Sequence, residues 1–151
     1  MADVPVEEYV CTRIRRAEHA LMAHHEAALR GYGLTMTQYT VLLTLSRADG
    51  MSGAQLARAL GVTQQSMATV LTGMQNKGLI DRRPAAVHAK VMIATATPAG
   101  RDLLDRAYRE VIVLERALTD RFTPDEHRQF CEFLDRATAT LVEQTPTAHP
   151  N

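Results

Sequence analysis

The sequence of 151 residues predicts a mainly α-helical protein with about six helices and a small sheet of two or three strands. Three observations carry this prediction. Residues 52–77 have the pattern of two short helices joined by a tight turn, two short strand candidates follow them, and long amphipathic segments occupy both ends of the chain. Two short helices, a hairpin and a further helix, in that order, form a winged helix-turn-helix.

The N-terminal part should form a long helix over residues 6–30, because apolar residues recur there at helical spacing until Gly31 and Gly33 interrupt it. Thr35 and Gln38 then form a capping box that opens a second helix over residues 36–47. That helix has little polar surface, so we expect it to lie in the centre of the core.

The helix-turn-helix begins at Ser52, which forms a capping box with Gln55, and its turn follows Gly61. Thr63 is the expected N-cap of the second helix. One face of this second helix is apolar and should be buried, whereas the opposite face is polar and uncharged. The apolar face consists of Met67, Val70, Leu71 and Met74, and the polar face of Gln64, Gln65, Ser66, Thr69 and Thr72.

A wing should follow, with strands over residues 79–83 and 91–97. Thr97 and Pro98 then begin a helix that reaches about Leu118, because threonine suits the N-cap and proline the first helical position. A third capping box, from Thr123 to Glu126, opens a last helix. The remaining residues, 145–151, have the composition of a disordered tail.

Several short motifs together resemble the MarR family of bacterial transcription regulators, over about residues 6–143. They are Gly33-Leu34-Thr35-x-x-Gln38, Val41-Leu42, Gln55-Leu56-Ala57, Lys77-Gly78-Leu79-Ile80-x-Arg82 and Thr97-Pro98-Ala99-Gly100. The family commonly has Asp-x-Arg near the wing tip, where this sequence has His88-Ala89-Lys90. Lys90 should therefore meet phosphate as a point charge and not as a planar fork.

The predicted domain organisation follows from these elements. Residues 34–97 should form the DNA-binding lobe, and residues 6–30 with 98–144 a helical dimerisation region. The terminal helices carry more apolar surface than a single winged domain can cover, and a lone recognition helix reads too few bases to specify a site. We therefore expect a homodimer, as the resemblance also implies.

Charge and composition narrow the function. The formal net charge is zero, but residues 50–90 contain five Lys/Arg and one acidic residue, whereas residues 101–151 contain seven Arg and ten acidic residues. This distribution would orient the protein on DNA. The acidic N-terminus is unlike a signal peptide, and no apolar run approaches a membrane span, so a cytoplasmic protein without membrane association is expected.

The predicted partner is double-stranded DNA with an inverted-repeat operator, and the predicted function is that of a homodimeric repressor. No Gly-rich phosphate loop, HExxH or GxSxG motif occurs, so we expect neither an enzyme nor a cofactor. The residues expected at DNA are Ser52, Thr63, Gln64, Gln65, Ser66, Thr69, Lys77, Arg83, His88 and Lys90.

The resemblance also implies a small-molecule effector that releases the operator, bound between the dimer helices and the DNA-binding lobe. We place Met22, His25, Met36 and Tyr39 near it. Soft methionine side chains with one tyrosine and one histidine suit an aromatic or phenolic ligand.

Two alternatives remain open. Cys11 lies 22 positions before Gly33, similar to the peroxide-sensing cysteine of the OhrR branch of the family, although Arg15 and His25 stand where that branch has tyrosines. A winged helix can also be a protein-interaction module. We expect no metal site, because neighbouring histidines such as His19 and His24 lack the i, i+4 spacing of ligands on one helix face.

Overall fold

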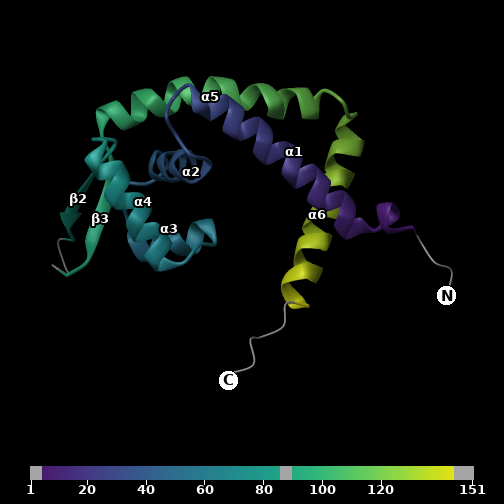
Figure 1. The fold of residues 1–151 in the computed structure, drawn as a ribbon, viewed down its shortest axis with the longest axis horizontal. Helices are drawn as coiled ribbons and strands as arrows, with labels where there is room; N and C mark the ends of the chain where they lie inside the picture. The colour runs from purple at the N-terminus through teal and green to yellow at the C-terminus, as the bar shows by residue number, and fades with distance from the viewer. Residues whose placement is uncertain (1–4, 86–89, 145–151) are drawn as a thin grey trace. The chain divides into compact units, whose positions relative to one another are not determined.

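The computed structural model describes residues 5–85 and 90–144 of the chain. They fall into two compact units that divide between residues 111 and 112, inside a helix. The elements in order are the 3-10 helix η1 (Val6–Glu8), α1 (Val10–Arg30), α2 (Met36–Leu45), β1 (Met51–Ser52), α3 (Gly53–Leu60), α4 (Gln64–Asn76), β2 (Ile80–Pro84), β3 (Met92–Ala96), α5 (Pro98–Thr119) and α6 (Pro124–Glu143) (Figure 1).

The expected single helix over residues 6–30 is wrong at its start. Tyr9 has extended backbone dihedrals (φ −64°, ψ 133°), so it separates the short η1 from α1. Within η1 the amide of Tyr9 bonds to the carbonyl of Val6, which closes a 3-10 turn instead of continuing an α-helix. The apolar spacing of this segment contains no signal for such a break. The second helix is also shorter than expected, because α2 ends at Leu45.

All three predicted capping boxes are present. In each one the Thr or Ser hydroxyl accepts from the amide three residues on, and the Gln or Glu side chain accepts from the amide of the cap residue. At α3, the Gln55 side-chain oxygen lies 2.8 Å from the Ser52 amide nitrogen. These boxes pair amides that a helix start would otherwise leave without a partner.

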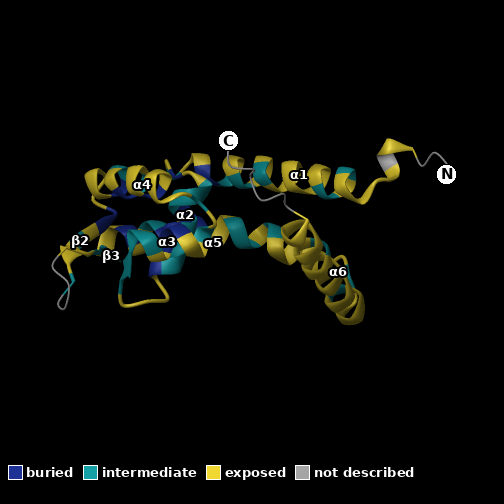
Figure 2. Cartoon of the chain, turned by 90° about the horizontal axis from the view of Figure 1, so that it is seen from below, coloured by how far each residue is buried: buried dark blue, intermediate teal, exposed yellow. Residues whose placement is uncertain are grey.

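The core of the first unit surrounds α2, as its apolar composition predicts. Val41 and Leu42 of this helix are fully buried, and Tyr39 is 3% exposed. The helix-turn-helix adds Leu56, Met67 and other apolar residues to the same cluster, and α5 adds Leu104 and Ala107. Figure 2 shows buried, dark blue segments around α2, α3 and α4.

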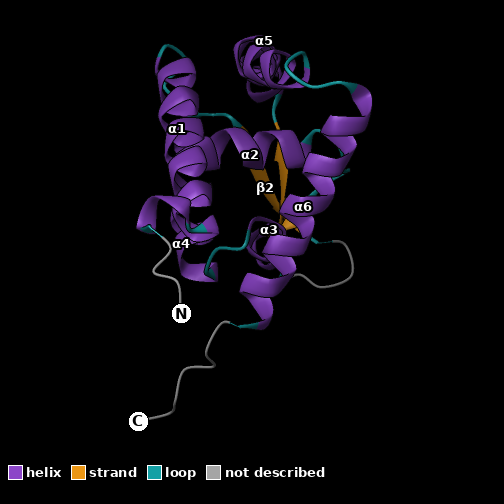
Figure 3. Ribbon diagram, turned by 90° about the vertical axis from the view of Figure 1, so that its right-hand side faces the viewer, coloured by secondary structure: helices purple, strands orange, loops and turns teal. Residues whose placement is uncertain are grey.

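The sheet has three antiparallel strands in the order β1-β3-β2 (orange in Figure 3). The two wing strands lie within one residue of their predicted bounds, and Arg82 pairs with Ala94 in their register. The third strand, β1, pairs Met51 with Ala94 and Ser52 with Ile93. It ties the start of the helix-turn-helix directly to the wing.

The second unit contains the end of α5 and all of α6. None of the 20 residues of α6 is buried, although the helix carries large apolar side chains such as Phe133, which is 52% exposed. The rings of Phe122 and Phe130 stack with centroids 5.3 Å apart. No helix within the described ranges is long and apolar enough to cross a membrane.

Candidate nucleic-acid interface

Helices α3 and α4 form the helix-turn-helix, and their turn depends on Gly61. This glycine has a left-handed backbone conformation (φ 66°, ψ 28°), and the next amide, of Val62, bonds to the carbonyl of Ala57. A residue with a side chain would be strained in this conformation, so glycine is the natural choice at the end of α3. The chain can then start α4 three residues later, at Gln64.

The two faces of α4 differ as the spacing predicts. Met67, Leu71 and Met74 are at most 1% exposed and fix the helix against the core. The opposite face is exposed and carries no charge; its polar residues are Gln64, Gln65, Ser66, Thr69 and Thr72. Such amides and hydroxyls can donate to and accept from base edges and phosphates.

The polar side chains on α4 differ in how free they are to bind a ligand. Thr69 and Thr72 donate their hydroxyl protons to carbonyls one turn earlier in the helix. The hydroxyl of Thr63 accepts from the Ser66 amide and donates to the Ser66 hydroxyl, so both residues form the cap. Among the described residues, none forms a hydrogen bond with the side-chain amides of Gln64 and Gln65. These two amides therefore remain available to bind DNA.

The other residues predicted to meet DNA lie at the edges of the lobe. Ser52 is engaged in the cap of α3. On β2, the Arg83 guanidinium lies 4.0 Å from the Asp81 carboxylate, and its side chain is 83% exposed, so solvent weakens this ion pair. Lys90 is exposed in the turn before β3. His88 lies outside the described residues.

Lys77, which follows α4 directly, makes a contact that sequence spacing does not reveal. Its ammonium donates to the carbonyl oxygen of Gly33 at 3.0 Å and lies 3.4 Å from the side-chain oxygen of Gln38. Both acceptors belong to the turn between α1 and α2 or to the first turn of α2. The contact therefore joins the end of α4 to a segment about 40 residues earlier in the chain.

Two hollows in the first unit involve the residues predicted to bind a ligand. Met22 and Met36 line both of them, one of about 410 Å³ with Arg30 and Leu34, and one of about 380 Å³ with Leu60 and others. His25 and Tyr39 line neither hollow. The structure thus brings together two of the four predicted residues.

Burial shifts the pKa values of His25 and Tyr39, the two predicted residues that line neither hollow. It lowers the pKa of His25, with His24 adding to the effect, and the Nδ1 atom of His25 is buried without a hydrogen-bond partner among the described residues. Burial raises the pKa of Tyr39, and nearby Tyr108 raises it further. A separate hollow of about 310 Å³, which the sequence did not predict, lies between α2 and α5 and is lined by Leu43, Ser46, Arg47, Arg101, Leu104, Asp105 and Tyr108.

The two cysteines are both free and exposed. Cys131 lies one helical turn from His127, with 4.0 Å between sulfur and Nε2, whereas Cys11 has no recorded partner in the described part of the chain. Within the same residues, no group of three or more His, Cys, Asp or Glu side chains could hold a metal ion.

Known proteins of similar sequence and structure indicate the family of the chain. A family model described as the MarR family matches residues 32–90. The chain is 34% identical over 110 residues to the HTH-type transcriptional repressor Rv2887 of Mycobacterium tuberculosis, covering 73% of this chain and 79% of that protein. The solved structure of Rv2887 with p-aminosalicylic acid has 31% identity and a TM-score of 0.65, and covers 86% of this chain and 98% of that one.

The repressor CouR bound to a 23-mer DNA duplex resembles the chain in structure, with a TM-score of 0.80 at 23% identity. The match covers 87% of this chain and 94% of CouR. At this identity the likeness concerns the fold alone, which is the winged helix-turn-helix that the sequence predicts.

Proposed function

This chain belongs to the MarR family of transcription regulators, and from that premise we propose that it is a homodimeric repressor that binds an inverted-repeat operator. The observation that carries the proposal is the exposed, uncharged face of α4, with the side-chain amides of Gln64 and Gln65, which no described residue engages, at its N-terminal end. In a helix-turn-helix, the first residues of the second helix reach the floor of the major groove.

The charges around this face support an approach to DNA. Acidic residues are absent from α4, and the exposed cations Arg83 and Lys90 lie on the wing. A surface that must approach phosphates gains from the absence of carboxylates, because phosphate contacts supply most of the non-specific affinity. The wing cations would then position the protein, and the glutamines would read bases.

The dimer is supported by the apolar surface of α6, which has no buried residue. Phe130, Phe133 and Leu134 are each more than 40% exposed within one turn of this helix. Contiguous apolar surface of this kind marks a protein-protein contact. We propose that a second copy of the chain covers it, so that two α4 helices face successive half-sites.

Relief by a small ligand is proposed at the hollow lined by Met22 and Met36. The relative Rv2887 has a solved complex with p-aminosalicylic acid, an aromatic carboxylate. In this chain Arg30 and Glu26 both line the same hollow; Arg30 could pair with a ligand carboxylate, while the methionines contact a ring.

Selection of binding sites from random duplexes, followed by gel shift at several salt concentrations, tests the proposal. We expect enrichment of an inverted repeat with half-sites about 10 base pairs apart, and binding that weakens with salt. p-Aminosalicylic acid is then added to the complex, and relief by a ligand predicts that the duplex is released. Enrichment of no sequence above the input pool would contradict the proposed function.

A further inference from the structure

Lys77 holds the end of α4 against the turn between α1 and α2. Its ammonium carries three donors, and two acceptors lie within reach: the Gly33 carbonyl at 3.0 Å and the Gln38 side-chain oxygen at 3.4 Å. Gly33 itself has a positive φ of 62°, which a glycine adopts without strain. The carbonyl that receives Lys77 is thus presented by a turn that residues with side chains rarely form.

Gln38 links this contact to the start of α2. Its side-chain oxygen also accepts from the Thr35 amide at 3.3 Å, and its own amide donates to the Thr35 hydroxyl. One oxygen therefore serves both the capping box and Lys77. Any shift of α4 at this end would have to break a contact that the central helix of the core holds in place.

Lys77 ties this end of α4 to the turn between α1 and α2, while the Gly78 carbonyl, two residues after α4, accepts from the Thr97 hydroxyl at 2.7 Å. The buried residues Met67, Leu71 and Met74 fix the rotation of the helix about its axis, and Thr63 caps its first turn. After Asn76 the chain turns at Gly78, whose φ is 69°. Lys77 lies between Asn76 and Gly78, and its ammonium is directed at the Gly33 carbonyl of the same chain.

We propose that Lys77 is a positioning residue that sets the placement of α4 for reading DNA, and not one of the DNA contacts among which the sequence analysis places it. The proposal rests on the proposed DNA-binding function. Its consequence is a separation of effects: loss of Lys77 should impair recognition of the cognate sequence without changing the number of phosphates that the protein neutralises.

The DNA experiment compares Lys77→Met with Lys90→Met, which removes a cation of the wing. Affinities for the selected operator and a scrambled duplex are measured over a range of salt concentrations. For Lys77→Met we expect roughly five- to tenfold weaker operator binding, unchanged scrambled binding and an unchanged salt slope. For Lys90→Met we expect weaker binding to both duplexes and a slope reduced by about 0.9 per subunit.

A second measurement needs no DNA. In Lys77→Met, amide hydrogen exchange should rise several-fold at residues 32–38 and at residues 77–79, because the tether between them is gone. Lys77→Arg keeps a charged donor and should restore protection. Thr35→Ala weakens the cap of α2 but leaves both acceptors of Lys77, so it should raise exchange in the first segment only.

A salt slope that falls in Lys77→Met as it does in Lys90→Met would overturn the proposal, as would unchanged exchange in both segments. If the wild-type protein binds no selected duplex, the proposed function fails. The exchange result then decides separately whether Lys77 tethers α4.

Discussion

Gly100, in the first turn of α5, lies directly against the carbonyl oxygen of Leu79. A Cβ atom at Gly100 would overlap that oxygen and would also lie 3.2 Å from the side chain of Leu42. The junction is further tied by Thr97, which donates to the Gly78 carbonyl at 2.7 Å and accepts from the Gly100 amide at 3.0 Å. The Thr-Pro-Ala-Gly motif thus joins α5 to the chain immediately after α4.

Gly100→Ala should therefore destabilise the protein. The added methyl group meets backbone, which cannot rotate away, and overpacking of this kind costs about 1–3 kcal/mol. The matched control is Gly73→Ala, in the interior of α4, where a Cβ meets nothing within 4 Å. It should raise stability by about 0.5–1 kcal/mol through helix propensity. Urea unfolding of both variants measures the difference, and equal effects would contradict the close contact.

Much of the fold was predictable because its signals are local. The capping boxes at Thr35, Ser52 and Thr123 each involve residues three positions apart, so sequence and structure carry the same information. The buried face of α4 follows from helical spacing in the same way. The fold class and the MarR family were predicted correctly on this basis.

Contacts between distant segments were not predictable. The partners of Lys77 lie 44 and 39 positions earlier in the chain, and no periodicity connects them. Strand β1 has only two residues, too few for an alternating pattern, and its pairing with β3 comes from tertiary packing. The sequence also indicated His25 and Tyr39 as ligand neighbours, but helical position alone could not show that neither lines a hollow with Met22 and Met36.

The apolar face of α6 provides a test of the proposed dimer. Phe133→Asp places a charge at a position that is 52% exposed in the single chain, so the fold of the chain should tolerate it. If a second copy buries this ring, losing about 1.5–3 kcal/mol per copy should raise the dimer dissociation constant at least tenfold. Analytical ultracentrifugation measures it, with Glu132→Ala as control. A dimer of unchanged affinity would exclude this face.

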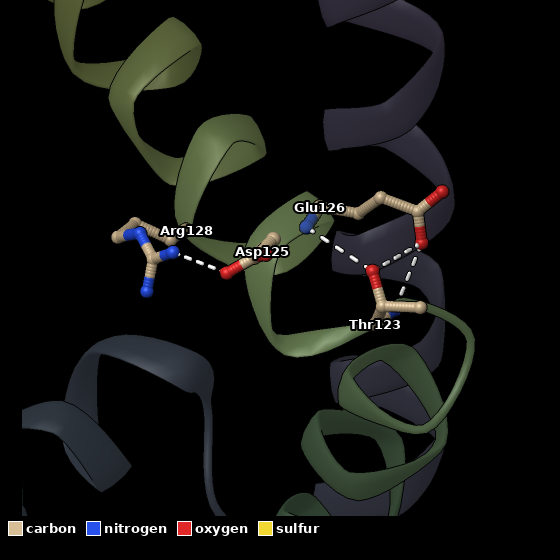
Figure 4. Close-up of polar contacts among 4 residues, drawn as sticks. All are labelled: Thr123, Asp125, Glu126 and Arg128. Atoms are coloured by element: carbon tan, nitrogen blue, oxygen red, sulfur yellow. Dashed lines mark hydrogen bonds and ion pairs between the residues drawn. The ribbon is translucent and has the colours of Figure 1, made fainter.

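The start of α6 should make stability depend on pH. Figure 4 shows the Glu126 carboxylate between the amide and the hydroxyl of Thr123, with the Asp125–Arg128 ion pair nearby. These hydrogen bonds lower the pKa of Glu126 below its usual 4.5. A lowered folded-state pKa means that the contribution is present above the unfolded pKa and is lost as the pH falls through the folded one.

Glu126→Gln keeps an acceptor for the cap but cannot titrate. The variant should lose less thermal stability than the wild-type protein when the pH falls from about 6 to about 3. Asp125→Asn, which removes the neighbouring carboxylate, serves as the comparison. Identical acid profiles for Glu126→Gln and the wild type would show that this cap contributes nothing to the pH dependence.

Cys11 tests the thiol-based alternative. The thiol is exposed on α1, and no described residue is recorded as its partner. We expect Cys11→Ser to bind the selected operator like the wild type and both proteins to keep the operator after peroxide treatment. Operator release by peroxide in the wild type, but not in the serine variant, would instead assign a redox function to this cysteine.

The last prediction separates reading of bases from binding of phosphate. Gln65 is exposed near the N-terminal end of α4, and its amide can make a bidentate contact with adenine in the major groove. Gln65→Ala should cost about 1–3 kcal/mol on the selected operator and relax the preference at one position per half-site, without changing the salt slope.

Lys90→Ala should change the salt slope and leave the sequence preference unchanged, because a wing cation that contacts phosphate does not distinguish one base sequence from another. Binding should weaken on operator and scrambled duplexes alike, and the slope of log affinity against log salt should fall by about one per subunit. Both variants are measured on both duplexes in one salt series. If Lys90→Ala altered the sequence preference and Gln65→Ala only the slope, the two roles would have to be exchanged, with the wing reading bases and α4 binding the backbone.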